Sequence, residues 1–256
     1  MTTNKQSEMS NPTADVLVMK NWEKVILLME NDPKVTREII EHKLHLSRSG
    51  VAKIIRQLIE DGRIQRIGPD KGGMWEVLKS DEEPEYLFFW GHDPKKLGLE
   101  KACFSQWFIR PFTVDNHYYC CMEQYMMSEK ARLFKDMETF VKILNESDPA
   151  IIKKLGREVR NFKSDVWNEH NMDIVFKGNL AKFSQNEDLK QILLATGKKV
   201  LVEASPYDQI WGIGMRECAK AKNHRNWKGL NKLGYTLTRV KRAIMAQMIC
   251  GDKVDE

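Results

Sequence analysis

The spacing of hydrophobic residues in the first eighty positions predicts three helices followed by two short strands. Residues 22–30, WEKVILLME, have the period of an amphipathic helix. Thr36 is a suitable N-cap for a second helix that reaches about Leu44, because its side chain can accept a hydrogen bond from the first turn. Glu38 lies near the positive end of that helix, where a carboxylate is favourable.

A third helix follows the turn LHLSRSG. Either Ser47 or Ser49 can cap it, and it extends to about Glu60, before Asp61 and Gly62 end it. Its buried side is predicted to consist of Val51, Ile54, Ile55, Leu58 and Ile59. RIQRIG then alternates as a strand, PDKGG is typical of a turn, and MWEVL returns as a second strand.

Helix, helix, helix and two-stranded ribbon is the order of a winged helix-turn-helix. In this order, and in the phrase SRSGVAKIIRQLIEDGRIQRIG, the segment resembles the winged-helix modules of bacterial regulators. In such modules the second helix of the pair enters the DNA major groove and the wing touches the backbone. The resemblance implies that Ser47, Arg48, Ser49, Lys53 and Arg56 face the groove, and that Arg63, Arg66 and Lys71 lie on the wing. The alternative is a docking or dimerisation domain, because acidic residues nearly balance the bases.

Residues 81–86 form an acidic linker that contains a proline. The expected organisation is a flexible tail (1–17), the winged helix-turn-helix (18–80), the linker, and a second domain (87–250). The fold class is mainly α with small β elements (α+β), and the second domain is largely helical.

The second domain begins with the buried strand EYLFFWGH. Residues 148–197 are predicted to be mainly helical, with breaks at Gly156 and Gly178 and a stop at Gly197. KKVLVEASPYDQIWGIG reads as a strand that runs into a loop, and a final helix follows.

Residues 118–134, YYCCMEQYMMSEKARLF, contain no Gly or Pro, and a helix is predicted throughout. Spacings of three and four residues place Tyr119, Glu123, Met126, Met127 and Lys130 on one stripe. A carboxylate among apolar side chains is poorly hydrated, which favours its acid form, and an amine there loses some preference for its charged form. From the residues alone, a structural ion pair on a helix surface is the more common arrangement.

The motifs of residues 85–245 occur in a characteristic order: FxxG, FSxW, MEQYMMxEKA, LGRxV, W, KFxQN, LLxTG, LVEASPxDxIWGIG and WxGxNxLG. In this order the segment resembles the NADAR family, also called YbiA-like. The resemblance implies an N-glycoside hydrolase. Members act on ADP-ribose attached to a base, notably guanine in DNA, or on phosphoribosylated pyrimidine intermediates of riboflavin synthesis.

The resemblance also implies roles for individual residues. Glu123 is the catalytic carboxylate, Lys130 is a second motif position, and Asp208 can accept ribose hydroxyls or position water. Arg157 is suited to clamp phosphate and Trp167 to stack on the leaving base. The implied substrate-binding set is Trp90, Gly91, Phe104, Ser105, Arg157, Trp167, Trp211, Gly212 and Asn231, of which Asn231 has the alternative of holding its loop. Gln106 stands where the family commonly has Asn, so this position departs from the family pattern.

Two mechanisms fit the pair Glu123 and Lys130. Cleaving a C–N bond at an anomeric carbon passes through an oxocarbenium-like state and requires a proton for the leaving base. In the first mechanism Glu123 acts with water near neutral pH, and Lys130 binds phosphate or orients the glutamate. In the second, Lys130 forms a Schiff base with the opened ribose and Glu123 carries protons.

The amino-acid composition narrows the possible classes of protein further. The 256 residues are 42% hydrophobic and 30% charged, which is typical of a globular protein, and the net charge of +5 permits a nucleic-acid partner. The polar N-terminus predicts no secretory signal, and no apolar run suits a membrane helix. The five cysteines form no CxxC pair and the histidines show no ligand spacing, so reduced thiols, a cytoplasmic location, no metal and no cofactor are expected.

Three functions fit these features. The leading hypothesis is removal of ADP-ribose from guanine in DNA, with the winged helix delivering the enzyme to DNA and an ADP-ribosyltransferase toxin as a functional counterpart. The second is destruction of phosphoribosylated riboflavin intermediates, which leaves the first domain unexplained. The third is a transcriptional regulator that senses ADP-ribose or NAD without turnover, against which the intact set of site residues argues.

Overall fold

The computed structural model describes residues 19–67, 73–78 and 84–250. The predicted tail (1–17), most of the linker, the turn PDKGG and Lys71 lie outside these residues. The chain divides into two compact units, one formed by residues 1–83 with 242–256 and the other by residues 84–241.

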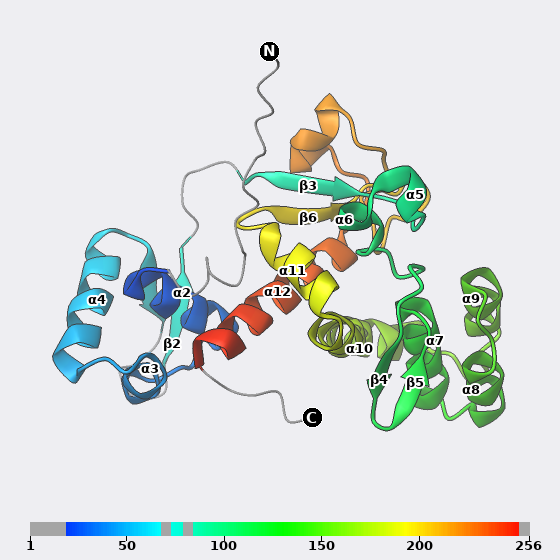
Figure 1. Cartoon of the computed structure of the whole chain (residues 1–256), viewed down its shortest axis with the longest axis horizontal. Helices are drawn as coiled ribbons and strands as arrows, with labels where there is room; N and C mark the ends of the chain where they lie inside the picture. The colour runs from blue at the N-terminus through cyan, green and yellow to red at the C-terminus, as the bar shows by residue number, and fades with distance from the viewer. Residues whose placement is uncertain (1–18, 68–72, 79–83, 251–256) are drawn as a thin grey trace, which may run out of the picture. The chain divides into compact units, whose positions relative to one another are not determined.

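The first unit contains three helices and then an antiparallel ribbon (Figure 1). The elements are α2 (Asn21–Asn31), α3 (Arg37–Leu44), α4 (Arg48–Glu60), β1 (Ile64–Ile67) and β2 (Met74–Val77). The Thr36 hydroxyl accepts a hydrogen bond from the Ile39 amide and so caps α3, as predicted. Ser47, and not Ser49, caps α4, because its hydroxyl accepts the Gly50 amide at 3.2 Å.

The core of this unit joins all five elements. It includes Val25, Leu28, Met29, Ile40, Val51, Ile55, Leu58, Ile64 and Trp75. The prediction that Ile59 belongs to the buried side of α4 was wrong, because its side chain is 47% exposed, whereas Ile54 packs at the edge of the core. The predicted order of elements is present, and the assignment as a winged helix-turn-helix stays a prediction.

A parallel strand pair organises part of the second unit. β3 (Tyr86–Phe89) pairs with β6 (Val200–Glu203), with Phe89 opposite Glu203 (Figure 1). Since the carboxyl ends of parallel strands meet at one edge, the segments that follow Phe89 and Glu203 leave the sheet together. Ligands commonly bind at this edge of a parallel sheet.

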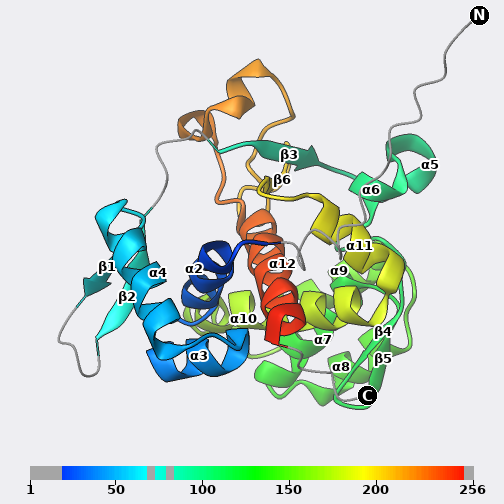
Figure 2. The ribbon, with the colours of Figure 1, turned by 60° about the vertical axis from the view of Figure 1, so that its left-hand side comes forward.

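A helical layer forms the rest of the unit. The hairpin of β4 (Phe112–Val114) and β5 (His117–Tyr119) leads into α7 (Met122–Leu133), which packs against α8 (Met137–Leu144), α9 (Pro149–Arg157) and α10 (Ser164–Gln185). The remaining elements of this unit are α5 (Pro94–Leu97), α6 (Leu99–Ala102), α11 (Glu187–Ala195) and the 3-10 turns η1 (Ala219–Lys222) and η2 (His224–Asn226). The last helix, α12 (Lys232–Cys250), begins in this unit, and its residues from 242 onward belong to the first unit. Figure 2 shows the elements from a second side.

The predicted helix over residues 118–134 was too long at its start. Residues 117–119 pair with β4, and Cys121 is extended with φ −158°, so the helix begins at Met122. Tyr119 therefore belongs to β5 and does not share the helical stripe of Glu123. Its ring packs edge-on against Tyr125 with centroids 5.1 Å apart.

One of the two predicted helix breaks was also wrong. Gly178 lies inside α10, whereas the break predicted at Gly156 is confirmed to within one residue, because α9 ends at Arg157. A Cβ atom at Gly156 would overlap Met127, and one at Gly178 would overlap the Tyr125 ring. Both glycines therefore let their helices approach α7 closely. The predicted stop at Gly197 was correct, since this residue has φ +55° just after α11.

The described residues are mainly helical with three two-stranded sheets, which confirms the expected fold class. None of the helices in the described part of the chain is both long and apolar enough to span a membrane.

Candidate active site

Glu123 lies in the first turn of α7 and is 3% exposed. Its amide donates to the Gln106 carbonyl at 2.9 Å, and its Oε2 accepts from Trp107 Nε1 at 3.2 Å. Burial raises the pKa of Glu123 to about 7, against the opposing charge of Lys153. Among the described residues no donor reaches Oε1, so one oxygen of a carboxyl that titrates near neutral pH is left for a ligand.

A buried lysine holds the turn that carries Trp107. Lys182 on α10 is completely buried, and its Nζ donates to the carbonyls of Cys103 at 2.7 Å and Ser105 at 3.3 Å. The Ser105 hydroxyl in turn accepts the Trp107 amide at 3.1 Å. Burial lowers the pKa of Lys182 to about 8. Ser105, predicted to bind substrate, therefore fixes the residues that orient Glu123.

Two further carboxyl groups stand near Glu123. Glu203 is the last residue of β6, and Asp208 lies in the loop that follows. Burial, followed by the charge of Asp208, raises the pKa of Glu203 to about 8. Asp208 Oδ1 accepts the amides of Ile210 at 2.8 Å and Trp211 at 2.7 Å, which fixes its carboxyl group.

The three carboxyl groups act on one another electrostatically. Asp208 contributes to the raised pKa of Glu123, and Glu123 contributes to that of Glu203. Within the described residues, Glu203 Oε2 and the Gln106 side-chain oxygen also lack a donor. Buried carboxyl oxygens without partners on two residues that act on one another, Glu123 and Glu203, indicate a candidate ligand site.

Cations from α9 face these carboxyl groups. The charge of Lys153 lowers the pKa of both Glu123 and Glu203, and its Nζ lies 5.7 Å from the Trp107 ring centroid. Arg157, four residues further along α9, is exposed and also acts on Glu123. A phosphate beside the carboxyl groups would find both cations on one helix face.

Lys130 lies on the same side of α7 but does not contact Glu123. The two are seven residues apart, about 10.5 Å along the helix axis. Lys130 Nζ donates to the Gly156 carbonyl at 2.7 Å and lies 4.2 Å from the Phe162 ring and 6.0 Å from the Trp167 ring. Of the roles left open for Lys130, direct orientation of Glu123 is therefore not the one that the structure shows: Trp107 and the Gln106 backbone hold the glutamate.

The environment of the Lys130 amine nevertheless differs from that of an ordinary surface lysine. Burial, followed by the charge of Arg157, lowers the pKa of Lys130. Among the described residues no carboxylate forms an ion pair with it. Trp167 is partly buried beside the amine, where its ring can meet a ligand.

Other predicted residues surround the carboxyl ends of β3 and β6. Trp90 directly follows β3 and is 37% exposed, and Gly91 has φ +99°, a conformation that favours glycine. Gly212 is buried, and a Cβ there would lie 2.9 Å from the Glu203 and Asp208 carbonyl oxygens. Glycine at position 212 thus keeps the two carboxylate-bearing segments close together.

Two predicted binding residues serve the interior instead. Phe104 is completely buried, with its ring 5.4 Å from Phe89 and 6.1 Å from Phe183. Asn231 is also completely buried, its Oδ1 accepting the Glu203 amide and its Nδ2 donating to the Leu201 carbonyl. Neither side chain offers surface to a substrate, and Asn231 fits the alternative that it holds its loop. Trp211 is partly buried, and its backbone joins the same loop through Asp208 and Leu233.

Sequence reasoning missed Glu203, Lys153 and Trp107. A charged residue at the end of the apolar strand VLVE was a usable signal, because that end of a parallel strand is where ligands bind. The spacing of Lys153 and Arg157, which places both on one helix face, was another. Trp107 was visible only within the motif FSQW.

The basic residues predicted to bind DNA differ in their surroundings. Arg48, Ser49, Lys53 and Arg56 are exposed along α4, whereas the Ser47 hydroxyl is used in the helix cap. On the ribbon, Arg63 lies over the Trp22 ring at 4.5 Å and Arg66 over the Trp75 ring at 4.7 Å.

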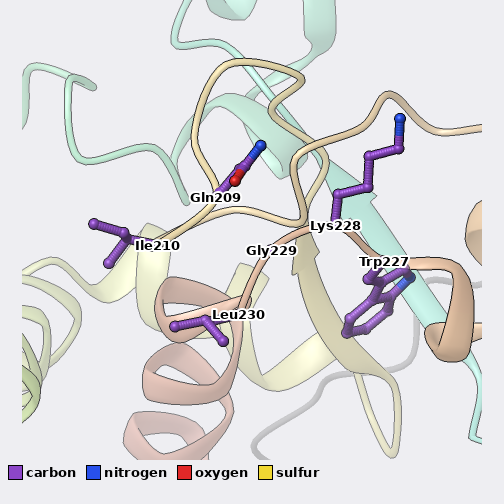
Figure 3. A pocket seen from close by; sticks show the side chains of 6 residues that line it. All are labelled: Gln209, Ile210, Trp227, Lys228, Gly229 and Leu230. Atoms are coloured by element: carbon purple, nitrogen blue, oxygen red, sulfur yellow. The ribbon is translucent and has the colours of Figure 1, made fainter.

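An open hollow lies beside the loop that contains Asp208. It has a volume of about 440 Å³ and is lined by Gln209, Ile210, Trp227, Lys228, Gly229 and Leu230 (Figure 3). In the described ranges no group of three or more His, Cys, Asp or Glu residues is arranged to hold a metal ion.

Residues 88–245 match the NADAR domain, and the chain belongs to this family. It is 44% identical over 166 residues to N-glycosidase R617 of Acanthamoeba polyphaga mimivirus, covering 62% of this chain and 96% of the relative. It is 32% identical over 144 residues to N-glycosidase Npun_R5314 of Nostoc punctiforme, covering 56% of this chain and 85% of that protein. The NMR structure of the E. coli protein YbiA superposes with a TM-score of 0.52 at 25% identity, covering 64% of this chain and 86% of that one. The protein is an N-glycosidase of the NADAR family, a hydrolase of N-glycosyl bonds.

Proposed function

We propose that this N-glycosidase removes ADP-ribose from a modified nucleobase, with ADP-ribosylated guanine in DNA as its main substrate. The observation that carries the proposal is the group of buried carboxyl oxygens without donors, next to the cations Lys153 and Arg157. Such a site suits a substrate with three features: a base that takes up a proton, a ribose whose hydroxyl groups donate hydrogen bonds, and a phosphate whose charge the cations neutralise.

Proton transfer falls to the carboxyl groups. When the bond from C1′ to the base nitrogen breaks, the base must take up a proton and the sugar carbon becomes positively charged. Glu123, with a pKa of about 7, can supply that proton at neutral pH and recover it afterwards. The charge of Asp208 can stabilise the cationic sugar, while Glu203 shares the proton held within the group.

Lys130 is proposed to act as a nucleophilic amine. Its lowered pKa and the lack of a carboxylate partner among the described residues suit an amine that attacks C1′ while the bond to the base breaks and Glu123 protonates the base. The C1′–O4′ bond then opens to give a Schiff base, which water hydrolyses to release the sugar and the free amine. Arg157 and Lys153 are then the groups that bind phosphate. The separation of Lys130 from Glu123 leaves room for a sugar between them, with the base toward Glu123.

Replacing Lys130 by Arg tests this role. We expect a loss of kcat/KM of at least about a hundredfold, because arginine keeps the charge but cannot form an imine. Borohydride added during turnover of the wild type should leave a sugar adduct on Lys130, detectable by peptide mass. K142R, an exposed lysine of α8, is the matched control. An arginine variant with more than about a third of wild-type activity would assign Lys130 to phosphate binding instead.

The first unit is proposed to be a winged helix-turn-helix that brings the enzyme to DNA. The exposed basic side chains of α4 support this role, since a recognition helix contacts the groove through such side chains. The double variant R48A/K53A should then bind duplex DNA more weakly and with a shallower dependence on salt. Binding that these substitutions leave unchanged would make the unit a docking domain.

The function is tested with purified full-length protein and a DNA oligonucleotide that carries ADP-ribosylated guanine. Loss of the modification, followed by gel mobility and mass, is the expected result. Cleavage of a phosphoribosylated aminouracil instead would place the enzyme in the removal of damaged metabolites. Binding of ADP-ribose without turnover of either substrate would make the protein a ligand-dependent regulator.

A further inference from the structure

An exposed aromatic surface lies at the carboxyl ends of β3 and β6. We call Trp90, Tyr207 and Arg216 the stacking platform. The rings of Trp90 and Tyr207 are 6.0 Å apart with planes inclined by 56°, and Arg216 Cζ lies 5.2 Å from the Trp90 ring centroid. Tyr207 is 81% exposed and Trp90 is 37% exposed, so both rings present surface to solvent.

The stacking platform adjoins the carboxyl groups of the active site. Trp90 follows Phe89, which pairs with Glu203 across the sheet, and Tyr207 directly precedes Asp208. The Phe89 carbonyl accepts the Ala204 amide at 2.8 Å, and the Tyr207 amide donates to the Ser205 hydroxyl at 3.3 Å. The platform is therefore built from the same two segments that position Glu203 and Asp208.

The chain that follows Arg216 is rich in positively charged residues. After Arg216, the chain exposes Lys220, Lys222, Arg225 and Lys228. The one acid in this run, Glu217, lies 3.9 Å from Lys101. Trp227 anchors the later part of this run at the opposite, amino end of β3, where its ring packs on Tyr86 at 5.4 Å and its Nε1 donates to the Ala221 carbonyl at 2.8 Å. Lys228 borders the hollow in Figure 3.

Exposed aromatic rings interleaved with cations are suited to one class of ligand. A nucleobase stacks on an aromatic ring through its face, whatever its sequence identity, and the cations attract its phosphate. Binding of this kind needs ring faces open to solvent, which Tyr207 provides. An apolar partner would not call for an arginine on the Trp90 ring.

We propose that the stacking platform binds a second nucleobase of the substrate, next to the base that is released, with its phosphate on Arg216. This inference rests on the proposed function. The second base has two sources, the adenine of ADP-ribose or the neighbouring base of a nucleic-acid strand. Both present the same chemistry, an aromatic base joined to phosphate.

The test compares full-length wild type, Y207A, Y207F and the control Y118A on three substrates. Tyr118 is a tyrosine of β5, 64% exposed and in a different sheet. The substrates are ADP-ribosylated guanine in an oligonucleotide, the same modification on the free nucleoside, and a phosphoribosylated base without adenosine. Binding of ADP-ribose and of an unmodified single-stranded oligonucleotide is measured in parallel by calorimetry.

We expect Y207A to lower kcat/KM about tenfold, the scale of one lost base–aromatic stack, and Y207F to retain wild-type values. A loss on the first two substrates assigns the platform to adenine, and a loss on the oligonucleotide alone assigns it to the neighbouring base. An equal loss on all three, or none, overturns the proposal. If no substrate is cleaved, the proposed function fails. The platform then stands only if Y207A weakens calorimetric binding, and falls if binding is unchanged or absent.

Discussion

Replacing Glu123 by Gln is expected to lower kcat/KM about a thousandfold, within the range for loss of a general acid or base. The amide preserves the size of the side chain and can still accept the hydrogen bond from Trp107 Nε1. It cannot give up a proton to the leaving base. Steady-state kinetics on the oligonucleotide that carries ADP-ribosylated guanine measures the effect.

The matched control is E138Q, because Glu138 is an exposed carboxylate of α8 in an ion pair with Lys142. Its activity should equal that of the wild type. The pH profile gives a second readout: wild-type kcat/KM should fall as pH rises through about 7, where Glu123 loses its proton. Two results would assign proton transfer to another group. One is an E123Q variant that keeps more than about a tenth of the wild-type activity, and the other is an E123Q variant whose kcat/KM falls with pH in the same way as that of the wild type.

Replacing Glu203 by Gln is expected to stabilise the protein at alkaline pH. Burial raises the pKa of Glu203 from its ordinary 4.5 to about 8, so the folded state binds this proton more tightly than the unfolded state. That contribution to stability is fully present below pH 4.5 and is lost as pH rises through about 8. Glutamine has no proton to lose, so the difference in unfolding free energy should grow from near zero at about pH 5 to the order of 2–4 kcal/mol at about pH 9.

Urea denaturation of wild type and E203Q at the two pH values measures this difference. E138Q again serves as the control, because the pKa of the Glu138 carboxyl is lowered by its bond to Lys142, and its removal gives no gain at alkaline pH. Equal stability of wild type and E203Q at both values would mean that Glu203 is not held in its protonated form. A stabilised E203Q that also loses activity would identify the group as one kept for function at a cost in stability.

Local features of the chain were predictable because they depend on neighbouring residues. The helix cap at Thr36, the ends of α3 and α4, and the strand β6 follow from side-chain type and spacing alone, whereas the structure decided between Ser47 and Ser49 as the cap of α4. The raised pKa of Glu123 was likewise predictable in direction, since its apolar neighbours on α7 imply burial. Family motifs added the chemistry that no spacing rule supplies.

Contacts between distant segments decided the rest. The start of α7 depends on β4, which pairs with residues 117–119, and the close packing of α10 on α7 depends on the space that Gly178 leaves for Tyr125. Only the folded chain brings Lys153 and Glu203 close enough to act electrostatically on Glu123. The fold also directs the Lys130 amine to the Gly156 carbonyl and not to Glu123. The sequence by itself thus determined the helices, the strands and the reactive residue types. The tertiary structure decided which of those residues meet, because electrostatic fields and buried hydrogen bonds act across space and not along the chain.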